Sequence, residues 1–475
     1  MTFTVRHVEF FRLDMQTRFP FRYGIASMTE VPHLVIRIDA LVDGQPCHGL
    51  AADGLPPKWF TKNPDTSYDQ DDLPAMLEAI RHAAELAIDA ASARSLFDWW
   101  WSRYEAQMSW ARQREIPTLL AGFGCSLIER AAIDAYCRAQ NLTLETALRS
   151  GALGTQLASM RPDLSPFRVA DVLPARANRS VIVRHTVGLG DPLTPGEISD
   201  DERLHDGLPH SLVESIRRYG LHFFKVKLSG DLEQDRHRMA ALQQLFEQEV
   251  GASMRLTLDG NEQYRSLAAF RDAWRTLRSD PAIRSMLDHS LLFVEQPLHR
   301  DVALQRSIGD ELAAWRDAPP IIIDESDSDM DAFPLAISLG YRGTSHKNCK
   351  GIFKSLATMA TIEMARAERG PLILSAEDLG NVGPIALLQD LAVVASLGIE
   401  HVERNGHHYF AGLSMFPDPI QQTVLEHHSD LYQQHSSGLA ALAIHDGVLR
   451  MGSVVNAPFG LRPPLDCDLL ESWKL

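Results

Sequence analysis

Two lysines and three carboxylates stand where predicted strands of this chain end. The stretch "LHFFKVKL" at 221–228 places Lys225 and Lys227 on one face of a strand, because side chains alternate along it. A lone pair of this kind usually marks solvated lysines on an edge strand. Three later predicted strands each carry an acidic residue where the strand ends, in "LTLDGN" at 256–261, "LFVEQP" at 292–297 and "IIIDES" at 321–326. A lone acidic residue there is usually a turn former or helix cap, but three in succession indicate a site.

The three carboxylates, Asp259, Glu295 and Asp324, predict a metal site. If the strands are neighbours, their ends converge, and the carboxylates would repel one another strongly without a cation. The set offers only oxygen ligands, with no cysteine or clustered histidine, which favours Mg²⁺ over Zn²⁺. We therefore expect Mg²⁺ as the cofactor, with Mn²⁺ as a possible substitute.

The lysines predict a proton transfer next to that metal. A cation facing a substrate carboxylate acidifies the proton on the adjacent carbon, and a nearby base can then remove it. Lysine can be that base if burial, the metal and a second ammonium lower its pKa. Lys225 and Lys227 supply such a pair: one would act as the base, and the positive charge of the other would lower the pKa of that base.

A sixth strand, "YRGTSHKN" at 341–348, carries another candidate. Lys347 and Lys350 lie three positions apart, so in one regular strand they would face opposite sides. Lys350 precedes Gly351 and a helix-like run, which places it in the turn. We therefore predict that Lys347 is the catalytic lysine of this strand.

The elements that would position these residues begin near residue 180. Strand-like runs alternate with helix-like runs, which is typical of a (β/α)-barrel with its active site at the carboxyl ends of the strands. A doubly wound open sheet is the alternative, and the lack of G-x-G-x-x-G after the first strand weakens its dinucleotide-binding form. The eight predicted strands are 180–188, 221–228, 254–261, 290–297, 320–326, 341–348, 370–377 and 398–405.

Residues 1–150 predict an α+β domain in front of the barrel. Strands are expected at 4–15 and 32–44, with a hairpin turn at Asp43-Gly44 and an aromatic, arginine-containing loop at 18–30 between the strands. Helical periodicity follows over 72–148. The barrel is assigned to 151–410, with a polar surface excursion at 190–210, and residues 411–475 are expected to return to the first domain.

Composition narrows the classes of partner. The formal net charge of −16 argues against nucleic acid or an anionic membrane. Five scattered cysteines without a C-x-x-C pair predict a reducing compartment rather than a disulfide framework. No signal-like start and no long apolar run is present, so we expect a cytoplasmic protein.

The combined motifs resemble the enolase superfamily, in the muconate lactonizing enzyme-like branch of the mandelate racemase group. The resemblance lies in "KVK" at 225–227, "DGN" at 259–261, "VEQP" at 294–297, "DES" at 324–326 and the strand-six lysine. It extends to "FPFRYG" at 19–24, which is similar to a mobile capping loop, and to the helix-like run 122–140. The family commonly has two glycines after the strand-six lysine, whereas "KNCKGIF" has one.

The resemblance implies the fold and the roles of the site residues. The fold would be α/β, a modified (β/α)7β TIM-type barrel with an α+β capping domain. Lys227 and Lys347 would be acid/base groups on opposite faces of the substrate carbon, with Lys225 assisting electrostatically. The implied metal ligands are Asp259, Glu295 and Asp324, and the residues supporting them are Asn261 and Glu325.

The implied activity is abstraction of the proton α to a carboxylate of a small molecule, giving racemisation, epimerisation or cycloisomerisation. One alternative is β-elimination, for which His401 is the nearest late-strand base. Another is a barrel that binds metal or metabolite without catalysis. We expect Phe21, Tyr23 and Lys58 to contact substrate, with Arg18 and Arg22 near a polar tail. A homo-oligomer is also expected.

Overall fold

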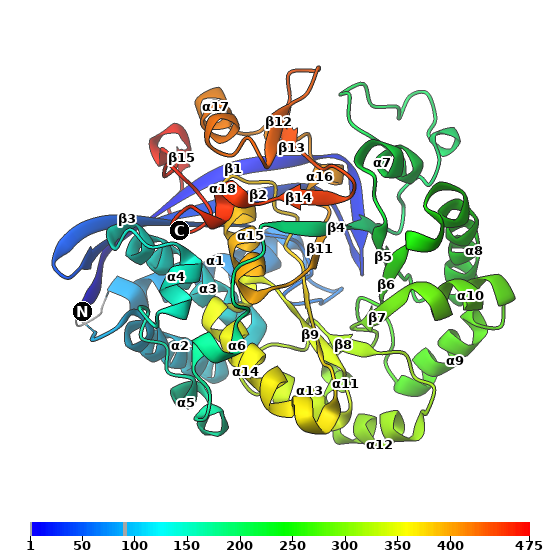
Figure 1. Ribbon diagram of the computed structural model, residues 1–475, viewed down its shortest axis with the longest axis horizontal. Helices are drawn as coiled ribbons and strands as arrows, with labels where there is room; N and C mark the ends of the chain where they lie inside the picture. Colours follow the sequence, from blue (N-terminus) through cyan, green and yellow to red (C-terminus); the bar gives the residue numbers. More distant parts are fainter. Residues whose placement is uncertain (1, 89–92) are drawn as a thin grey trace.

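Eight parallel strands form the central sheet of this protein, whose computed structural model describes residues 2–88 and 93–475. All eight predicted strands are present, in the order β11-β4-β5-β6-β7-β8-β9-β10 (Figure 1). A short antiparallel strand, β14 (Val448–Arg450), joins β4. The parallel strands are β4 (Ser180–Val187), β5 (Phe223–Lys227), β6 (Arg255–Asp259), β7 (Leu291–Glu295), β8 (Ile321–Ile323), β9 (Gly343–His346), β10 (Ile373–Ala376) and β11 (His401–Arg404).

Every crossover between consecutive parallel strands contains at least one helix, which gives the predicted (β/α)7β order. Local signals start several of these helices: Asp231 accepts from two backbone N–H groups at the start of α8, and Asp280 does the same before Pro281 in α10. The crossover helices are α7 (Leu212–Tyr219), α8 (Leu232–Glu249), α9 (Leu267–Leu277), α10 (Pro281–Ser290), α11 (Arg300–Ala303), α12 (Arg306–Ala314), α13 (Ala332–Leu339), α14 (Ile352–Arg369) and α15 (Ala386–Leu397).

Side chains close the barrel where the backbone ladder is open. Within the described residues no ladder joins β10 to β11, although the two strands lie in contact. Arg184 of β4 spans the gap: its Nη1 lies 2.7 Å from His401 Nδ1 on β11, and its Nη2 donates to Ser375 Oγ on β10 at 2.9 Å. The curled sheet therefore encloses a polar interior.

The capping domain is an antiparallel sheet packed against three helices. Its strands are β1 (Phe3–Tyr23), β2 (Ala26–Val42) and β3 (Gln45–Gly54), and its helices are α1 (Leu73–Ile88), α2 (Leu96–Gln113) and α3 (Thr118–Ala139). The helical prediction over 72–148 includes residues 89–92, which lie outside the described residues. Near the end of the chain, β15 (Glu471–Ser472) pairs with β1. Asp43 and Gly44 have φ of 50° and 79°, as a two-residue hairpin turn requires.

The remaining elements connect these two parts. The other helices are α4 (Leu144–Arg149), α5 (Leu157–Met160), α6 (Val169–Val172), α16 (Gly406–Tyr409), α17 (Asp418–His427) and α18 (Gly452–Val455), and the other strands are β12 (Tyr432–Gln434) and β13 (Ala440–Leu442). None of the helices in the described part of the chain is both long and apolar enough to cross a membrane.

The predicted loop at 18–30 is wrong, because most of it is strand. Cross-strand pairs such as Phe21 with Met28 and Tyr23 with Ala26 carry the β1–β2 ladder to a turn at Gly24-Ile25. A register shift between Gln16 and Phe21 accommodates the interruption. Figure 1 shows the long β1 strand passing α16, with which it is in contact. This stretch is therefore a paired ribbon and not an irregular loop.

The ribbon is fixed to the barrel through α16. Arg18 Nη1 donates to the carbonyl oxygens of His408 at 2.7 Å and Pro209 at 2.9 Å. The Phe21 ring stacks on Tyr409 with centroids 4.1 Å apart. Because α16 follows β11, these contacts hold the ribbon at the carboxyl ends of the barrel strands.

His407 of α16 predicts that acid lowers the stability of the protein. The pKa of His407 is lowered to about 3 because it is buried and lies near His408 and Arg404. An unfolded histidine has a pKa of about 6.5, so the unfolded chain binds more protons between these values and stability is lost as the pH falls through that window. Acidification from pH 7 to pH 5 should therefore lower the free energy of unfolding by about 2 kcal/mol through His407 alone.

Urea unfolding of the His407→Gln variant at pH 7 and pH 5 measures this contribution. The variant should lose about 2 kcal/mol less stability on acidification than the wild-type protein does. The control is His237→Gln, since the side chain of His237 is 70% exposed, and it should follow the wild-type pH dependence. Equal losses in His407→Gln and wild type would contradict the prediction.

Candidate active site

Lys225 and Lys227 point into the barrel from β5. Their neighbour Phe224 points outward and packs on Phe246 of α8, with ring centroids 4.4 Å apart. Lys225 is fully buried, and Lys227 is 6% exposed. The two lysines are therefore not solvated residues of an edge strand, because β5 lies between β4 and β6 in the sheet.

Carboxylates from four strands surround Lys225. Its Nζ lies 3.0 Å from Asp259 Oδ2, 2.9 Å from Glu295 Oε2, 2.9 Å from Glu377 Oε2 and 2.7 Å from Glu403 Oε2. Lys227 Nζ also contacts Asp259 Oδ2, at 2.6 Å. The ends of β6, β7, β10 and β11 thus meet around one ammonium group.

Three of the carboxylates form a group that suits a metal ion. Oxygens of Glu295, Asp324 and Glu377 lie within 4.8 Å of one another. Among the described residues Glu295 Oε1 has no hydrogen-bond partner and Oε2 has only the Lys225 ammonium, and burial together with nearby Glu377 raises the pKa of Glu295 well above its usual range. A buried oxygen that lacks a donor, in an all-oxygen set, fits a hard divalent cation.

The predicted triad is brought together only in part. Glu295 and Asp324 belong to the group of three, whereas its third member is Glu377. Asp259 is connected to this group through its ion pairs with Lys225 and Lys227. Burial raises the pKa of Asp259, but the two lysines outweigh burial and lower this pKa to about 2. Asp259 is therefore adjacent to the group and paired with both lysines of β5.

Sequence analysis missed Glu377 and Glu403. The predicted strands at 370–377 and 398–405 carry these carboxylates at or near their ends, which is the signal that identified Asp259, Glu295 and Asp324. Glu403 Oε1 also accepts from Thr186 Oγ1 at 2.6 Å, and Glu377 Oε1 accepts from Ser345 Oγ at 3.1 Å. Applied to all eight strands, the same rule would have found both residues.

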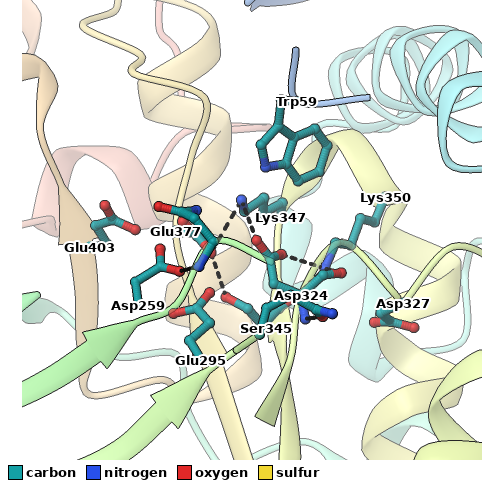
Figure 2. A network of polar contacts seen from close by, with 12 residues as sticks. Trp59, Asp259, Glu295, Asp324, Asp327, Ser345, Lys347, Lys350, Glu377 and Glu403 are labelled. Carbon is teal, nitrogen blue, oxygen red and sulfur yellow. Dashed lines mark hydrogen bonds and ion pairs between the residues drawn. The ribbon is translucent and has the colours of Figure 1, made fainter. Parts of the chain in front are cut away.

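Lys347 and Lys350 hold Asp324 between them (Figure 2). Lys347 Nζ lies 2.9 Å from Asp324 Oδ2 and 3.2 Å from Glu377 Oε1, with the Trp59 ring centroid at 4.1 Å. Lys350 Nζ lies 2.8 Å from Asp324 Oδ1 and donates to the Ser345 carbonyl. Both lysines reach this carboxylate because a 3-10 turn redirects the chain over Asn348–Lys350. The expectation that only one could point inward was therefore wrong.

The lysine pKa values also depart from the expectation. Burial lowers the pKa of Lys225, Lys227 and Lys347, but the surrounding carboxylates outweigh burial and raise all three. Asp259 is the main raising influence on both lysines of β5, and Asp324 on Lys347. In the protein without metal these lysines are therefore charged partners of the carboxylates.

A cavity between the capping domain and the barrel opens onto this cluster. The space not filled by atoms there is about 450 Å³ when the open solvent at the mouth is included. Lys227 and Lys347 both line it, whereas Lys350 is not among its lining residues. Phe21 and Tyr23, predicted to contact substrate, also line it. The two candidate acid/base lysines and the capping residues therefore share one space.

The three basic residues expected near the substrate bind other parts of the protein. Lys58 is paired with Asp72, with Nζ and Oδ2 3.0 Å apart, and also donates to Thr66. Arg18 is engaged by Asp206 at 2.6 Å, and Arg22 lies against Gly190. Three basic side chains expected near a substrate tail thus serve the packing of loops.

His401, the alternative base, lies at the amino end of β11 and contacts Arg184. This end is opposite the one at which Glu403 and the carboxylate cluster lie. His401 therefore cannot reach the cavity that Lys227 and Lys347 line.

The residues expected to support the ligands lie beside the cluster. Asn261 has a positive φ of 40°, and its backbone N–H donates to Asp259 Oδ1 at 2.8 Å. Glu325 is buried next to Asp324, and burial, followed by that neighbour, raises its pKa to about 8. Gln296, which sequence analysis did not select, accepts from the Asp324 backbone N–H at 2.7 Å. These contacts orient the two aspartates.

Comparisons with known proteins agree with this architecture. Residues 209–433 match the model of the enolase C-terminal domain-like family. Muconate lactonizing enzyme from Pseudomonas fluorescens, solved with muconolactone, is 18% identical, with a TM-score of 0.60 over 98% of each chain. N-succinyl Arg/Lys racemase from Bacillus cereus is 14% identical, with a TM-score of 0.57 over 96% of this chain and 98% of that one.

A dipeptide epimerase from Methylococcus capsulatus, solved with Mg and L-Arg-D-Lys, is 17% identical, with a TM-score of 0.53 over 94% of this chain and 99% of that one. No curated protein matches the chain in sequence. At these identities the solved structures establish the fold, and the family model covers β5 to β11, whose ends carry the carboxylate cluster. Residues 209–433 therefore match the enolase C-terminal domain-like family, and the chain as a whole has the fold of the muconate lactonizing enzymes, in agreement with the resemblance of its motifs.

Proposed function

We propose that this protein is a Mg²⁺-dependent enzyme that removes the proton α to a substrate carboxylate and returns a proton to the same carbon. The product would be the opposite configuration at that carbon, by racemisation or epimerisation. The observation that carries the proposal is the entry of Lys227 and Lys347 into one cavity from β5 and β9. Strands four places apart face each other across an eight-stranded barrel.

The local charges leave room for a cation and a substrate carboxylate. Ion pairs connect five carboxylates to four lysines at the barrel mouth, so one negative charge is in excess. The carboxylates are Asp259, Glu295, Asp324, Glu377 and Glu403, and the lysines are Lys225, Lys227, Lys347 and Lys350. A divalent cation would offset this excess and present positive charge to a substrate carboxylate.

Glu295, Asp324 and Glu377 would hold the cation, with Asp259 beside them. When bound, Mg²⁺ would supply positive charge next to the substrate carboxylate, which favours loss of the neighbouring proton. Lys227, once deprotonated, would accept that proton on its Nζ. Lys347, in its ammonium form beneath Trp59, would deliver a proton from the opposite side. For the other enantiomer the two lysines exchange roles.

Several observations favour inversion over elimination. Elimination needs one base and a leaving group, whereas two lysines on opposite sides suit transfer in both directions. His401, the base considered for elimination, lies at the far end of β11. Two of the structural neighbours, a racemase and a dipeptide epimerase, are named for this type of reaction. Cycloisomerisation shares the same first half-reaction and is the related outcome.

Proton exchange tests the proposal directly. We would incubate the protein with carboxylate panels in D₂O, with Mg²⁺ or with excess chelator, and follow α-deuterium by NMR. Metal-dependent exchange that is lost in Lys227→Ala or Lys347→Ala is expected. Tight Mg²⁺ binding without exchange, in a panel that includes 2-hydroxy acids, N-acylamino acids, dipeptides and dicarboxylates, would instead support a non-catalytic barrel.

A further inference from the structure

We infer that the substrate is a monocarboxylate whose remaining part is uncharged and largely apolar, and which carries a neutral hydrogen-bond donor. This inference rests on the proposed function and narrows its substrate class. It follows from three features of the cavity, namely its apolar wall, its paired charges and an unpaired amide oxygen.

The wall facing the carboxylate cluster is apolar and comes from separate segments. Phe21 and Met28 lie opposite each other in the β1–β2 ribbon, and both line the cavity. Trp59 comes from the segment after β3, and Leu379 from the segment after β10. A substituent beyond the reacting carbon would therefore meet aromatic and aliphatic side chains.

The Trp59 side of this wall is firmly held. Arg300 donates to the carbonyl oxygens of Trp59 at 2.8 Å and Phe60 at 2.7 Å. Its guanidinium also binds both Glu262 oxygens at 2.8 Å. Lys62 donates to the Asn261 carbonyl, next to the end of β6. These hydrogen bonds fix the Trp59 side of the apolar wall to the barrel.

The charged residues that line the cavity already have partners among the described residues. Lys227 is paired with Asp259, and Lys347 with Asp324 and Glu377. Asp378 is paired with Arg404, and Glu403 with Lys225. A second carboxylate or an ammonium group on the substrate would have to enter without a counterion, and burying an unpaired charge is strongly unfavourable.

A neutral donor is indicated by Asn405, which follows β11 and lines the cavity. The residue is 5% exposed, and its Oδ1 has no hydrogen-bond partner in the described part of the chain. That oxygen faces Gly380, where an added Cβ would lie 3.4 Å from it. A buried acceptor without a donor is costly, and a substrate hydroxyl or N–H would satisfy it.

The test uses ligands of one scaffold with Mg²⁺ present. The probes are 2-hydroxy-3-phenylpropanoate, its ring analogues with a 4-carboxylate or a 4-aminomethyl group, and 3-phenylpropanoate, which lacks the hydroxyl. Calorimetry should show that both charged analogues bind at least about 100-fold more weakly than the neutral hydroxy acid. Loss of the hydroxyl should weaken binding about tenfold, and Asn405→Leu should remove that difference.

Met28→Lys provides a gain-of-binding test. An ammonium in the apolar wall should improve binding of the 4-carboxylate analogue at least about tenfold over wild type. The matched control is Ile25→Lys, which adds the same charge at the hairpin turn, where Ile25 is 47% exposed and does not line the cavity. It should leave all affinities unchanged. If Met28→Lys does not fold, the wild-type panel still decides the question.

The two proposals can fail separately. Equal affinity of wild type for the neutral and charged analogues would overturn the substrate class. Deuterium exchange into a dicarboxylate or a dipeptide but not into the neutral acids would overturn it as well, while supporting the proposed reaction. Selective binding of the neutral hydroxy acid without exchange would support the substrate class and contradict the proposed reaction.

Discussion

Replacement of Glu295, Asp324 or Glu377 by alanine is expected to lower kcat/KM by at least about 1,000-fold, because each removes an oxygen from the group that would hold the cation. The loss also leaves a lysine without its counterion. Lys225 loses a partner when Glu295 or Glu377 is removed, and Lys347 loses one when Asp324 is removed. Activity and Mg²⁺ affinity by calorimetry should fall together, and far-UV circular dichroism should report a folded protein.

Asp327 offers a matched control for this prediction. It is as deeply buried as Asp324 and lies three residues along the chain, but it binds Lys354 at 2.5 Å and Thr344 at 2.8 Å. Figure 2 places it away from the other carboxylates, beyond Lys350. Asp327→Ala should therefore reduce stability while retaining Mg²⁺ affinity. Full turnover by Glu295→Ala after exhaustive chelation would contradict a metal role for the cluster.

Lys347→Ala is expected to abolish α-proton exchange from one enantiomer and to spare exchange from the other. The lysine enters the cavity on the side opposite Lys227, so each lysine serves one face of the substrate carbon. Loss of a general acid or base typically costs about 100- to 10,000-fold in rate. Lys227→Ala should give the opposite preference. Both enantiomers would be followed separately by NMR in D₂O.

Lys350→Ala is the comparison that separates proton transfer from charge. Lys350 also contacts Asp324, so its loss disturbs the same carboxylate, but it is not among the lining residues of the cavity. Any effect should therefore fall equally on the two enantiomers. An enantiomer preference in Lys350→Ala, together with equal losses in Lys347→Ala, would show that the roles of the two lysines are reversed.

Local patterns were sufficient for the barrel strands and for most of the charged residues at their ends. Alternating apolar residues followed by a turn identified all eight strands, since this pattern arises from neighbours in sequence. Lys225 and Lys227 could be assigned to one face for the same reason. The ribbon at 18–30 could not be predicted, because the pairing of Phe21 with Met28 overrides the strand-breaking character of Pro20, and only Gly24-Ile25 forms a turn.

The sequence by itself thus determined which residues stand at the carboxyl ends of the strands, because strand periodicity is a local property of the chain. Only the tertiary structure decided which of them meet. Lys225 and Glu377 are 152 residues apart, and Lys225 and Glu403 are 178 apart, yet both pairs are in contact because the barrel curls. Trp59 lies over Lys347 only because the capping domain packs on the barrel. Such contacts depend on closure of the sheet and on domain packing, which no short stretch of sequence encodes.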